Sequence, residues 1–270
     1  MPPQVTLPDR LRLPDGGEIA YGVHGAGPPL LLVPGLGGMA SSWDAITPAL
    51  AERFTVVLHD HRGTGASSRC DRPYSVASIA TDVLALMDHL GLPAAALVGH
   101  STGGAVGQHM ALHAPDRLTR LVLSATWARN CAYMRRLFAL RLRILNGVGM
   151  EAYRELSALV LAPPWWIAAQ PEPLLGPAAT PLEMEILRRR IGAVLAHDTQ
   201  DNLGRIALPV LVVTAQDDAV VPAAHSAGLA RDIAGARLAT LPDGGHLLPN
   251  VHPDAYLALL HDFLGAELSP

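Results

Sequence analysis

A glycine-framed serine separates an apolar segment from a helix-like segment of this chain. The motif is Gly99-His100-Ser101-Thr102-Gly103, with an apolar stretch at 94–98 before it and helical spacing at 104–114 after it. A strand, a sharp turn and a helix in this order hold a serine in a strained, exposed position, where its hydroxyl can act as a nucleophile. Because glycine and serine are common, the five residues alone are equally compatible with an ordinary strand-to-helix turn.

Strand-like and helix-like segments alternate on both sides of this motif, which is typical of an α/β sheet. Before the motif we predict a hairpin (11–13 and 18–24), strands at 30–33 and 54–58, and helices at 42–52 and 75–90. After the motif we predict strands at 118–124, 210–214 and 237–241, and helices at 223–233 and 253–264.

The alternation stops between residues 125 and 208. Within this region three segments have helical character: 132–145, 151–161 and 182–197. A proline- and tryptophan-rich break at Pro163-Pro164-Trp165-Trp166 interrupts them. We therefore predict an α/β core made of residues 1–124 and 209–270, and a helical cap made of residues 125–208.

Arginine supplies all 20 basic side chains of the chain, and half of them lie in the expected cap. We favour solvated helix faces as the explanation of the arginine clusters there. A basic rim that attracts anionic substrates is the alternative. The clustered residues are Arg135, Arg136, Arg141, Arg143, Arg188, Arg189 and Arg190. The lack of lysine excludes a lysine base and Schiff-base chemistry.

The composition also excludes several classes of protein. The net charge of −4 gives no basis for nucleic-acid binding, and no apolar run is long enough to predict a membrane span. Cys70 and Cys131 form no metal or redox motif, and the first residues lack the pattern of a secretory signal, so we expect a cytoplasmic protein. His59 and His61 flank Asp60, but no third ligand is evident, so we expect packing histidines and no metal or cofactor.

A nucleophilic serine needs a base, and the base needs a carboxylate that orients it. In an open α/β sheet the loops after the strands meet at one crevice. Downstream of Ser101, Asp217 and Asp218 follow one predicted strand, and His246 follows the next in a Gly-Gly-His turn. The order serine, aspartate, histidine is the one expected of this architecture.

Three other histidines are weaker candidates for the base. His225 and His252 lie at or inside predicted helix starts, where a capping or surface role is more ordinary. His100 directly precedes the serine, and we expect it to pack at the turn. His246 is therefore the predicted base.

Together these motifs resemble those of the α/β-hydrolase superfamily over about residues 10–265. Besides the serine motif, Pro34-Gly35-Leu36-Gly37-Gly38 resembles the oxyanion loop of that family, and residues 60–67 resemble a family segment before the next helix. The resemblance implies the α/β-hydrolase fold, with a mostly parallel eight-stranded sheet, helices on both faces and a helical cap over the active site.

The same resemblance implies a catalytic triad of Ser101, His246 and Asp218. The family spacing from the acid to Pro222 favours Asp218 over Asp217, which is then a solvated turn residue. The oxyanion hole is expected from the backbone N–H groups of Leu36 and Thr102. Many relatives carry His-Gly in the oxyanion loop where this chain has Pro34-Gly35, but the backbone donors do not depend on that side chain.

Four residues are candidates for the substrate pocket: Gly35, Trp127, Trp165 and Trp166. For the tryptophans, packing anchors are an equally good explanation. The cap segments around Trp127 and Trp165 are similar to the aminoacrylate hydrolases of bacterial pyrimidine degradation. The body of the chain also resembles the 3-oxoadipate enol-lactone hydrolases.

These observations predict a cofactor-free serine hydrolase that cleaves a small carboxylic ester or lactone through an acyl-enzyme. We expect a monomer or a homodimer without a nucleic-acid or membrane partner. The alternatives are a carbamate or aminoacrylate hydrolase, a perhydrolase, and a ligand receptor that keeps the fold but turns over slowly.

Overall fold

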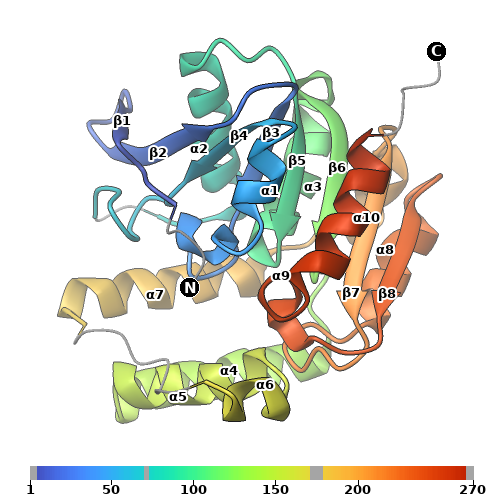
Figure 1. Cartoon of the computed structure of the whole chain (residues 1–270). Coiled ribbons are helices and arrows are strands. Elements are labelled where there is room, and N and C mark those ends of the chain that lie inside the picture. Colours follow the sequence, from blue (N-terminus) through green and yellow to red (C-terminus); the bar gives the residue numbers. More distant parts are fainter. Residues whose placement is uncertain (1–4, 70–72, 171–178, 266–270) are drawn as a thin grey trace.

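One twisted sheet runs through the middle of the structure (Figure 1). The computed structural model describes residues 5–69, 73–170 and 179–265, and eight strands of this part pair in the order β1-β2-β4-β3-β5-β6-β7-β8. The strands are β1 (Asp9–Arg12), β2 (Glu18–His24), β3 (Pro29–Val33), β4 (Thr55–His59), β5 (Ala95–His100), β6 (Leu118–Ser124), β7 (Val210–Ala215) and β8 (Arg237–Leu241). All pairings from β4 to β8 are parallel, and the β1–β2 hairpin joins β4 in antiparallel fashion. The predicted fold class is confirmed.

Helices cover both faces of the sheet (Figure 1). Those in the core of the fold are α1 (Thr47–Ala51), α2 (Val76–His89), α3 (Thr102–His113), α8 (Ala224–Asp232), α9 (Leu248–Val251) and α10 (Pro253–Gly265). One apolar cluster joins the sheet to α2, α3 and α8, and a second joins the opposite face to α1 and α10. This arrangement leaves the ends of the strands free to carry loops.

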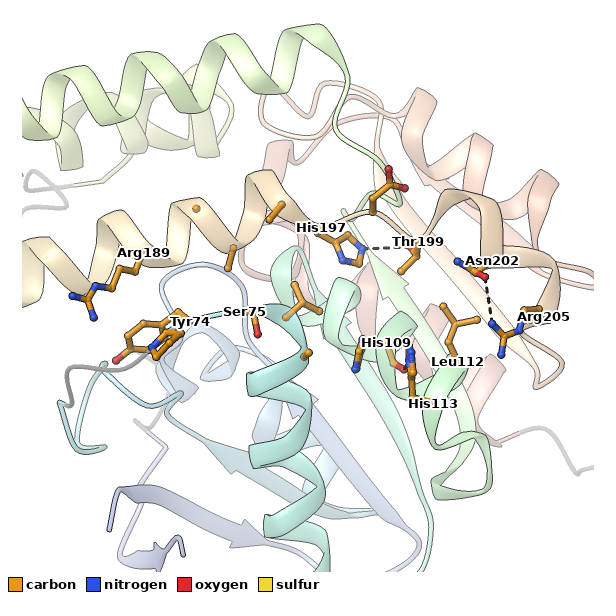
Figure 2. A pocket seen from close by; sticks show the side chains of 17 residues that line it. Tyr74, Ser75, His109, Leu112, His113, Arg189, His197, Thr199, Asn202 and Arg205 are labelled. Atoms are coloured by element: carbon orange, nitrogen blue, oxygen red, sulfur yellow. Dashed lines mark hydrogen bonds between the residues drawn. The ribbon is translucent and has the colours of Figure 1, made fainter. Parts of the chain in front are cut away.

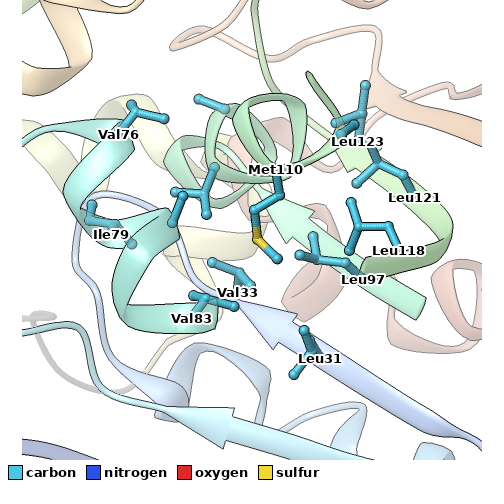
Figure 3. Packing of buried hydrophobic residues seen from close by; sticks show 14 of the residues in the cluster. Leu31, Val33, Val76, Ile79, Val83, Leu97, Met110, Leu118, Leu121 and Leu123 are labelled. Carbon is cyan, nitrogen blue, oxygen red and sulfur yellow. The ribbon is translucent and has the colours of Figure 1, made fainter. Parts of the chain in front are cut away.

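The parallel strands are apolar on both faces because side chains alternate along a strand. Leu31 and Val33 of β3 belong to the cluster under α2 and α3, where Met110 of α3 packs (Figure 3). Leu30 and Leu32 of the same strand belong to the cluster on the other face. A continuous apolar run therefore forms a central strand that is buried on both sides.

Between β6 and β7 the chain forms helices of its own: α4 (Ala132–Gly147), α5 (Met150–Leu161), α6 (Pro164–Ala168) and α7 (Pro181–Ala196). We call these four the helical layer. They lie together beyond one end of the sheet (Figure 1), with an apolar cluster that includes Trp127, Phe138, Ile191 and Val221. The layer therefore has a small core of its own.

Two of the predicted elements are wrong in detail. The single helix predicted at 42–52 is a 3₁₀ turn at Ala40–Trp43 followed by the short helix α1. Pro48 explains the break, because proline lacks an N–H group and its ring clashes with the carbonyl one turn earlier, so it is tolerated only in a first turn. The predicted break at 163–166 contains the start of α6, where Pro164 occupies the first helical position.

Other sequence predictions concern single residues. Ser75, where the sequence predicts the start of a helix, caps α2 by accepting a hydrogen bond from the Ser78 N–H. Cys131 is a half-buried free thiol before α4, whereas Cys70 lies outside the described residues. Among the helices that the structure describes, none is long and apolar enough to cross a bilayer.

Candidate active site

Ser101 occupies a strained turn between β5 and α3. Its backbone has φ 54° and ψ −116°, a region that residues other than glycine rarely adopt. The turn is tied to the next strand, since Ser101 N–H donates to Ser124 O at 2.8 Å and Thr126 Oγ1 donates to Ser101 O at 2.8 Å. A Cβ at Gly103 would lie 2.0 Å from Val33 O, so the close approach of α3 to β3 requires glycine there. The predicted strained conformation of the serine is confirmed, but its predicted exposure is wrong, because the residue is only 6% exposed beneath its neighbours.

The structure brings Ser101, His246 and Asp218 together in one hydrogen-bonded row. His246 Nε2 lies 2.9 Å from Ser101 Oγ, and His246 Nδ1 lies 2.8 Å from Asp218 Oδ2. Because a carboxylate accepts hydrogen bonds, Nδ1 carries the imidazole proton and Nε2 is left to accept one from the serine hydroxyl. All three side chains are buried, and each follows the carboxyl end of a strand: β5, β7 and β8.

The two neighbouring aspartates have different tasks. Asp218 Oδ1 accepts hydrogen bonds from Val220 N–H and Val221 N–H, both at 2.8 Å, while its second oxygen faces His246. Asp217 Oδ1 accepts the Gly245 N–H at 2.8 Å. Asp217 is therefore more than the solvated turn residue expected from the sequence, because it anchors the turn that presents His246.

The other candidate histidines do not take part in this hydrogen-bonded row. His252 Nε2 bonds to Asp243 at 2.6 Å, and the half-buried His225 lies on α8. His100 is buried, with its ring centre 5.0 Å from that of His246, and its Nδ1 lies 3.1 Å from Ser124 Oγ. Burial and the neighbouring His246 hold the pKa of His100 well below its ordinary value, so it packs against the site as a neutral ring.

The glycine-rich loop after β3 lies directly against the serine. A Cβ at Gly35 would lie 3.1 Å from Ser101 Cβ, closer than side chains usually approach, so glycine permits this close contact without a shift of the serine. Asp60 Oδ1 accepts the Ala40 N–H at 2.8 Å, so the segment after β4 anchors the far end of the loop. Among the described residues, neither Leu36 N–H nor Thr102 N–H has a protein partner, and both remain available to a ligand.

Next to the loop, the side chains of His59 and His61 form a buried pair. Their ring centres are 5.2 Å apart. Burial and the nearby Arg190 guanidinium lower the pKa of His59 to about 4 and that of His61 well below its ordinary value. Within the part of the chain that the structure describes, no group of three potential metal ligands occurs.

The three candidate pocket tryptophans occupy different environments. Trp127 is 1% exposed and packs edge-on against His197, with ring centres 5.8 Å apart. Trp165 is 52% exposed, with its ring centre 6.0 Å from that of His252, and Trp166 is half-buried. The packing explanation therefore fits Trp127 best, whereas Trp165 and Trp166 retain accessible surface.

A cavity of about 620 Å³ lies between α7 and the ends of α2 and α3. Figure 2 shows Tyr74, Arg189 and His197 on its walls, with His109 and His113 of α3 opposite α7. None of the predicted site residues lines it. This cavity is therefore separate from the row of Ser101, His246 and Asp218.

Two arginines of the expected solvated clusters are buried instead. Arg141 Nη2 donates to Tyr153 Oη at 2.7 Å and to Ser157 Oγ at 3.0 Å. Arg190 Nε donates to Leu36 O at 2.9 Å, inside the loop that faces the serine. Sequence reasoning missed Arg190 because 188–190 are all arginine. Consecutive helical residues point about 100° apart, so the helical period was the available sign that one of the three faces inward.

Comparisons with known proteins agree with this geometry. The family model for the alpha/beta hydrolase fold matches residues 28–166. A relative from Azorhizobium caulinodans that carries the name carbamate hydrolase RutD is 38% identical over 252 residues, which cover 92% of this chain and 95% of the relative. A protein of the same name from Variovorax paradoxus is 38% identical over 259 residues, covering 93% of this chain and 97% of its own.

Solved structures of similar shape include a hydrolase from Pseudomonas aeruginosa, with a TM-score of 0.83, 34% identity, and coverage of 96% of this chain and 98% of that chain. The enol-lactonase from Burkholderia xenovorans has a TM-score of 0.85 and 27% identity, covering 96% of this chain and 100% of its own. The similarity thus spans the helical layer as well as the sheet.

Proposed function

This chain belongs to the alpha/beta hydrolase fold family, and on that premise we propose that it is a serine hydrolase that forms an acyl-enzyme on Ser101. The observation that carries this proposal is the row of hydrogen bonds from Asp218 through His246 to Ser101 Oγ, with both distances below 3 Å. Such a row supplies a nucleophile, a base and a group that orients the base. The strained turn holds Ser101 Oγ within hydrogen-bond distance of His246 Nε2.

In the first half of the reaction His246 Nε2 takes the Ser101 proton while Oγ bonds to the substrate carbonyl carbon. The negative charge that develops on the carbonyl oxygen is stabilised by the N–H groups of Leu36 and Thr102. When the tetrahedral intermediate collapses, His246 gives its proton to the leaving amine or alcohol. Asp218 stabilises the imidazolium that exists between these two transfers.

In the second half water enters in place of the leaving group. His246 removes a proton from this water as its oxygen attacks the acyl carbon, and Ser101 Oγ leaves with the proton that His246 returns. The products are the free acid and the regenerated serine. The chain's own residues supply every proton transfer in this scheme.

For the substrate class we propose a small carbamate, cleaved at its carbon–nitrogen bond. The support is the name carbamate hydrolase carried by relatives that are 38% identical over almost their whole length. A small ester or lactone is the second candidate, supported by the 27% identical enol-lactonase of the same shape. Both classes present a carbonyl carbon to the same serine.

We further propose that residues 125–208 act as a cap and that residues 1–124 and 209–270 form the catalytic core. The apolar cluster of the helical layer and the contact of Arg190 with the loop beside Ser101 support this division. Trp165 and Trp166 are the cap residues that we assign to the pocket, because they keep accessible surface.

The test is turnover of matched substrates with the Ser101→Ala variant as the blank. We expect wild type to release ammonia from O-methyl carbamate over many turnovers, and the blank to release none above background. p-Nitrophenyl acetate and a small lactone are assayed in parallel. Their kcat/KM values, compared with that of the carbamate, test the second candidate substrate class. Equal turnover in wild type and blank would contradict the proposed nucleophile, and a single turnover without product release would point to a receptor.

A further inference from the structure

Arg190 enters the site from the helical layer. It lies on α7, 3% exposed, and its three hydrogen-bond acceptors are Leu36 O at 2.9 Å, His61 Nδ1 at 2.9 Å and Gly35 O at 3.4 Å. All of these acceptors are neutral. The guanidinium therefore donates hydrogen bonds to two successive carbonyls of the loop that lies against Ser101.

The surroundings of Arg190 do not explain it as an ion pair. No carboxylate among the described residues pairs with it, and burial lowers its pKa only to about 10, so it is charged at neutral pH. Because arginine only donates hydrogen bonds, His61 Nδ1 must accept, which requires a neutral ring. A buried cation without a counter-ion is costly, so its position calls for a role beyond stability.

The peptide between Gly35 and Leu36 connects this contact to the reaction. In a trans peptide the carbonyl and the following N–H point in opposite directions in one plane. Gly35 O faces Gly38 N–H at 3.0 Å and Arg190 Nη2, so Leu36 N–H points to the other side. Peptides in a glycine-rich loop rotate easily. If the Gly35–Leu36 peptide were reversed, the Gly35 carbonyl oxygen would point to the side to which the Leu36 N–H now points.

We propose that Arg190 is a positioning residue that holds the Gly35–Leu36 peptide in the orientation required of an oxyanion-hole donor. The helical layer then completes the oxyanion hole of the core. The shape of the loop fits this role, since a Cβ at Gly38 would lie 2.5 Å from Arg190 Nη2, in the space that the guanidinium occupies. The proposal rests on the function proposed above for Ser101.

Arg190 also has one atom that suggests a different role. Its Nη1 is buried without a partner among the described residues, and a free donor of this kind would serve to bind an anionic substrate. The two roles differ in kinetics. Loss of positioning lowers kcat for any substrate, whereas loss of an anion contact raises KM for anionic substrates alone.

The experiment compares Arg190→Met and Arg190→Lys with Arg188→Met, a control on the same helix whose side chain pairs with Glu185. Removal of one oxyanion donor costs about 10²–10³ in kcat. With the neutral ester p-nitrophenyl acetate, we therefore expect Arg190→Met to lower kcat by about 10–100-fold with KM changed less than about threefold. Arg190→Lys should fall between, and the control should match wild type.

Two further measurements keep the outcome independent of a folding defect. Methylguanidinium added to the Arg190→Ala variant should restore part of kcat, and the rate of phosphonate labelling at Ser101 should fall in parallel with kcat. A kcat in Arg190→Met equal to the control, or a change confined to KM for anionic substrates, would overturn the proposal. Wild type that neither turns over nor labels would overturn the proposed function as well, whereas active wild type with unaffected variants would overturn this inference alone.

Discussion

The α/β core and the helical layer contribute differently to the candidate site. The core supplies the whole row of Ser101, His246 and Asp218, each in a loop or turn that follows a parallel strand. The helical layer supplies the buried Arg190, which contacts the loop beside Ser101, and two tryptophans with accessible surface, Trp165 and Trp166. Under the proposed function, this comparison assigns the bond-breaking chemistry to the end of the sheet, and assigns orientation and selectivity to the helices beyond it.

The largest effect should come from removing the nucleophile from the core. Ser101→Ala should lower kcat by about 10⁴–10⁶, because the members of a triad act as a unit. The thermal unfolding midpoint should be retained, since the serine hydroxyl is a small part of the turn. Steady-state rates and thermal melts of both proteins check this, and an active variant would move the chemistry away from the sheet edge.

The next effect separates the two aspartates after β7. Asp218→Asn should cost about 10⁴ in kcat, because the amide leaves the imidazole of His246 in the wrong tautomer. Asp217→Asn retains an oxygen that can accept the Gly245 N–H, so its kcat should change less than about tenfold. If Asp217→Asn were the inactive variant, the assignment of the acid would be wrong.

Two tryptophans between β6 and β7 distinguish a packing role from a role in the pocket. Trp127→Ala should destabilise the fold by about 3–5 kcal/mol, because it removes a fully buried aromatic side chain. Trp165→Ala should leave stability nearly unchanged and alter the preference for acyl-chain length. Chemical denaturation and a series of p-nitrophenyl esters measure the two effects. An unchanged chain-length preference in Trp165→Ala would remove that residue from the pocket.

The smallest effect concerns acid stability. Burial lowers the pKa of His59 and His197 to about 4, and those of His61 and His100 fall well below 6.5. The unfolded chain binds protons on these histidines from about pH 6.5 downward, whereas the folded chain does not until about pH 4. Stability should therefore fall as the pH decreases through this window.

Thermal midpoints between pH 7 and pH 4 measure this dependence. His197→Gln removes one of the titrating groups, and it should make the decrease shallower if it folds as wild type does at pH 7. A midpoint that does not change over the window would contradict the burial of these rings as neutral groups.

The core could be read from the sequence more completely than the helical layer. The strand β6 begins and ends where its apolar run predicts, because a parallel strand buried on both faces needs a continuous apolar segment. The edge strand β8 also has the predicted bounds, although its side chains are mostly exposed. The order of Ser101, Asp218 and His246 along the chain could also be predicted, since each residue follows a predicted strand. Short elements around Pro48 and Pro164 were misread, because proline both ends and begins helices.

The contributions of the helical layer depend on tertiary contacts that no local pattern records. Arg190 lies 154 positions after Leu36, its hydrogen-bond partner, and its two arginine neighbours are partly exposed. The anchoring of the His246 turn by Asp217 is of the same kind, because it joins two loops that are 28 positions apart. Such contacts depend on how the elements pack against one another, which the pattern of a single sequence does not predict.

The most direct test of the account is covalent labelling of the intact protein with a serine-directed fluorophosphonate, followed by peptide mass spectrometry. The account predicts one adduct per chain, located on Ser101, and its absence in Ser101→Ala. Asp218→Asn should label much more slowly than wild type, because the base is misoriented. An adduct on another serine, or no adduct in a protein that turns over substrate, would contradict Ser101 as the nucleophile.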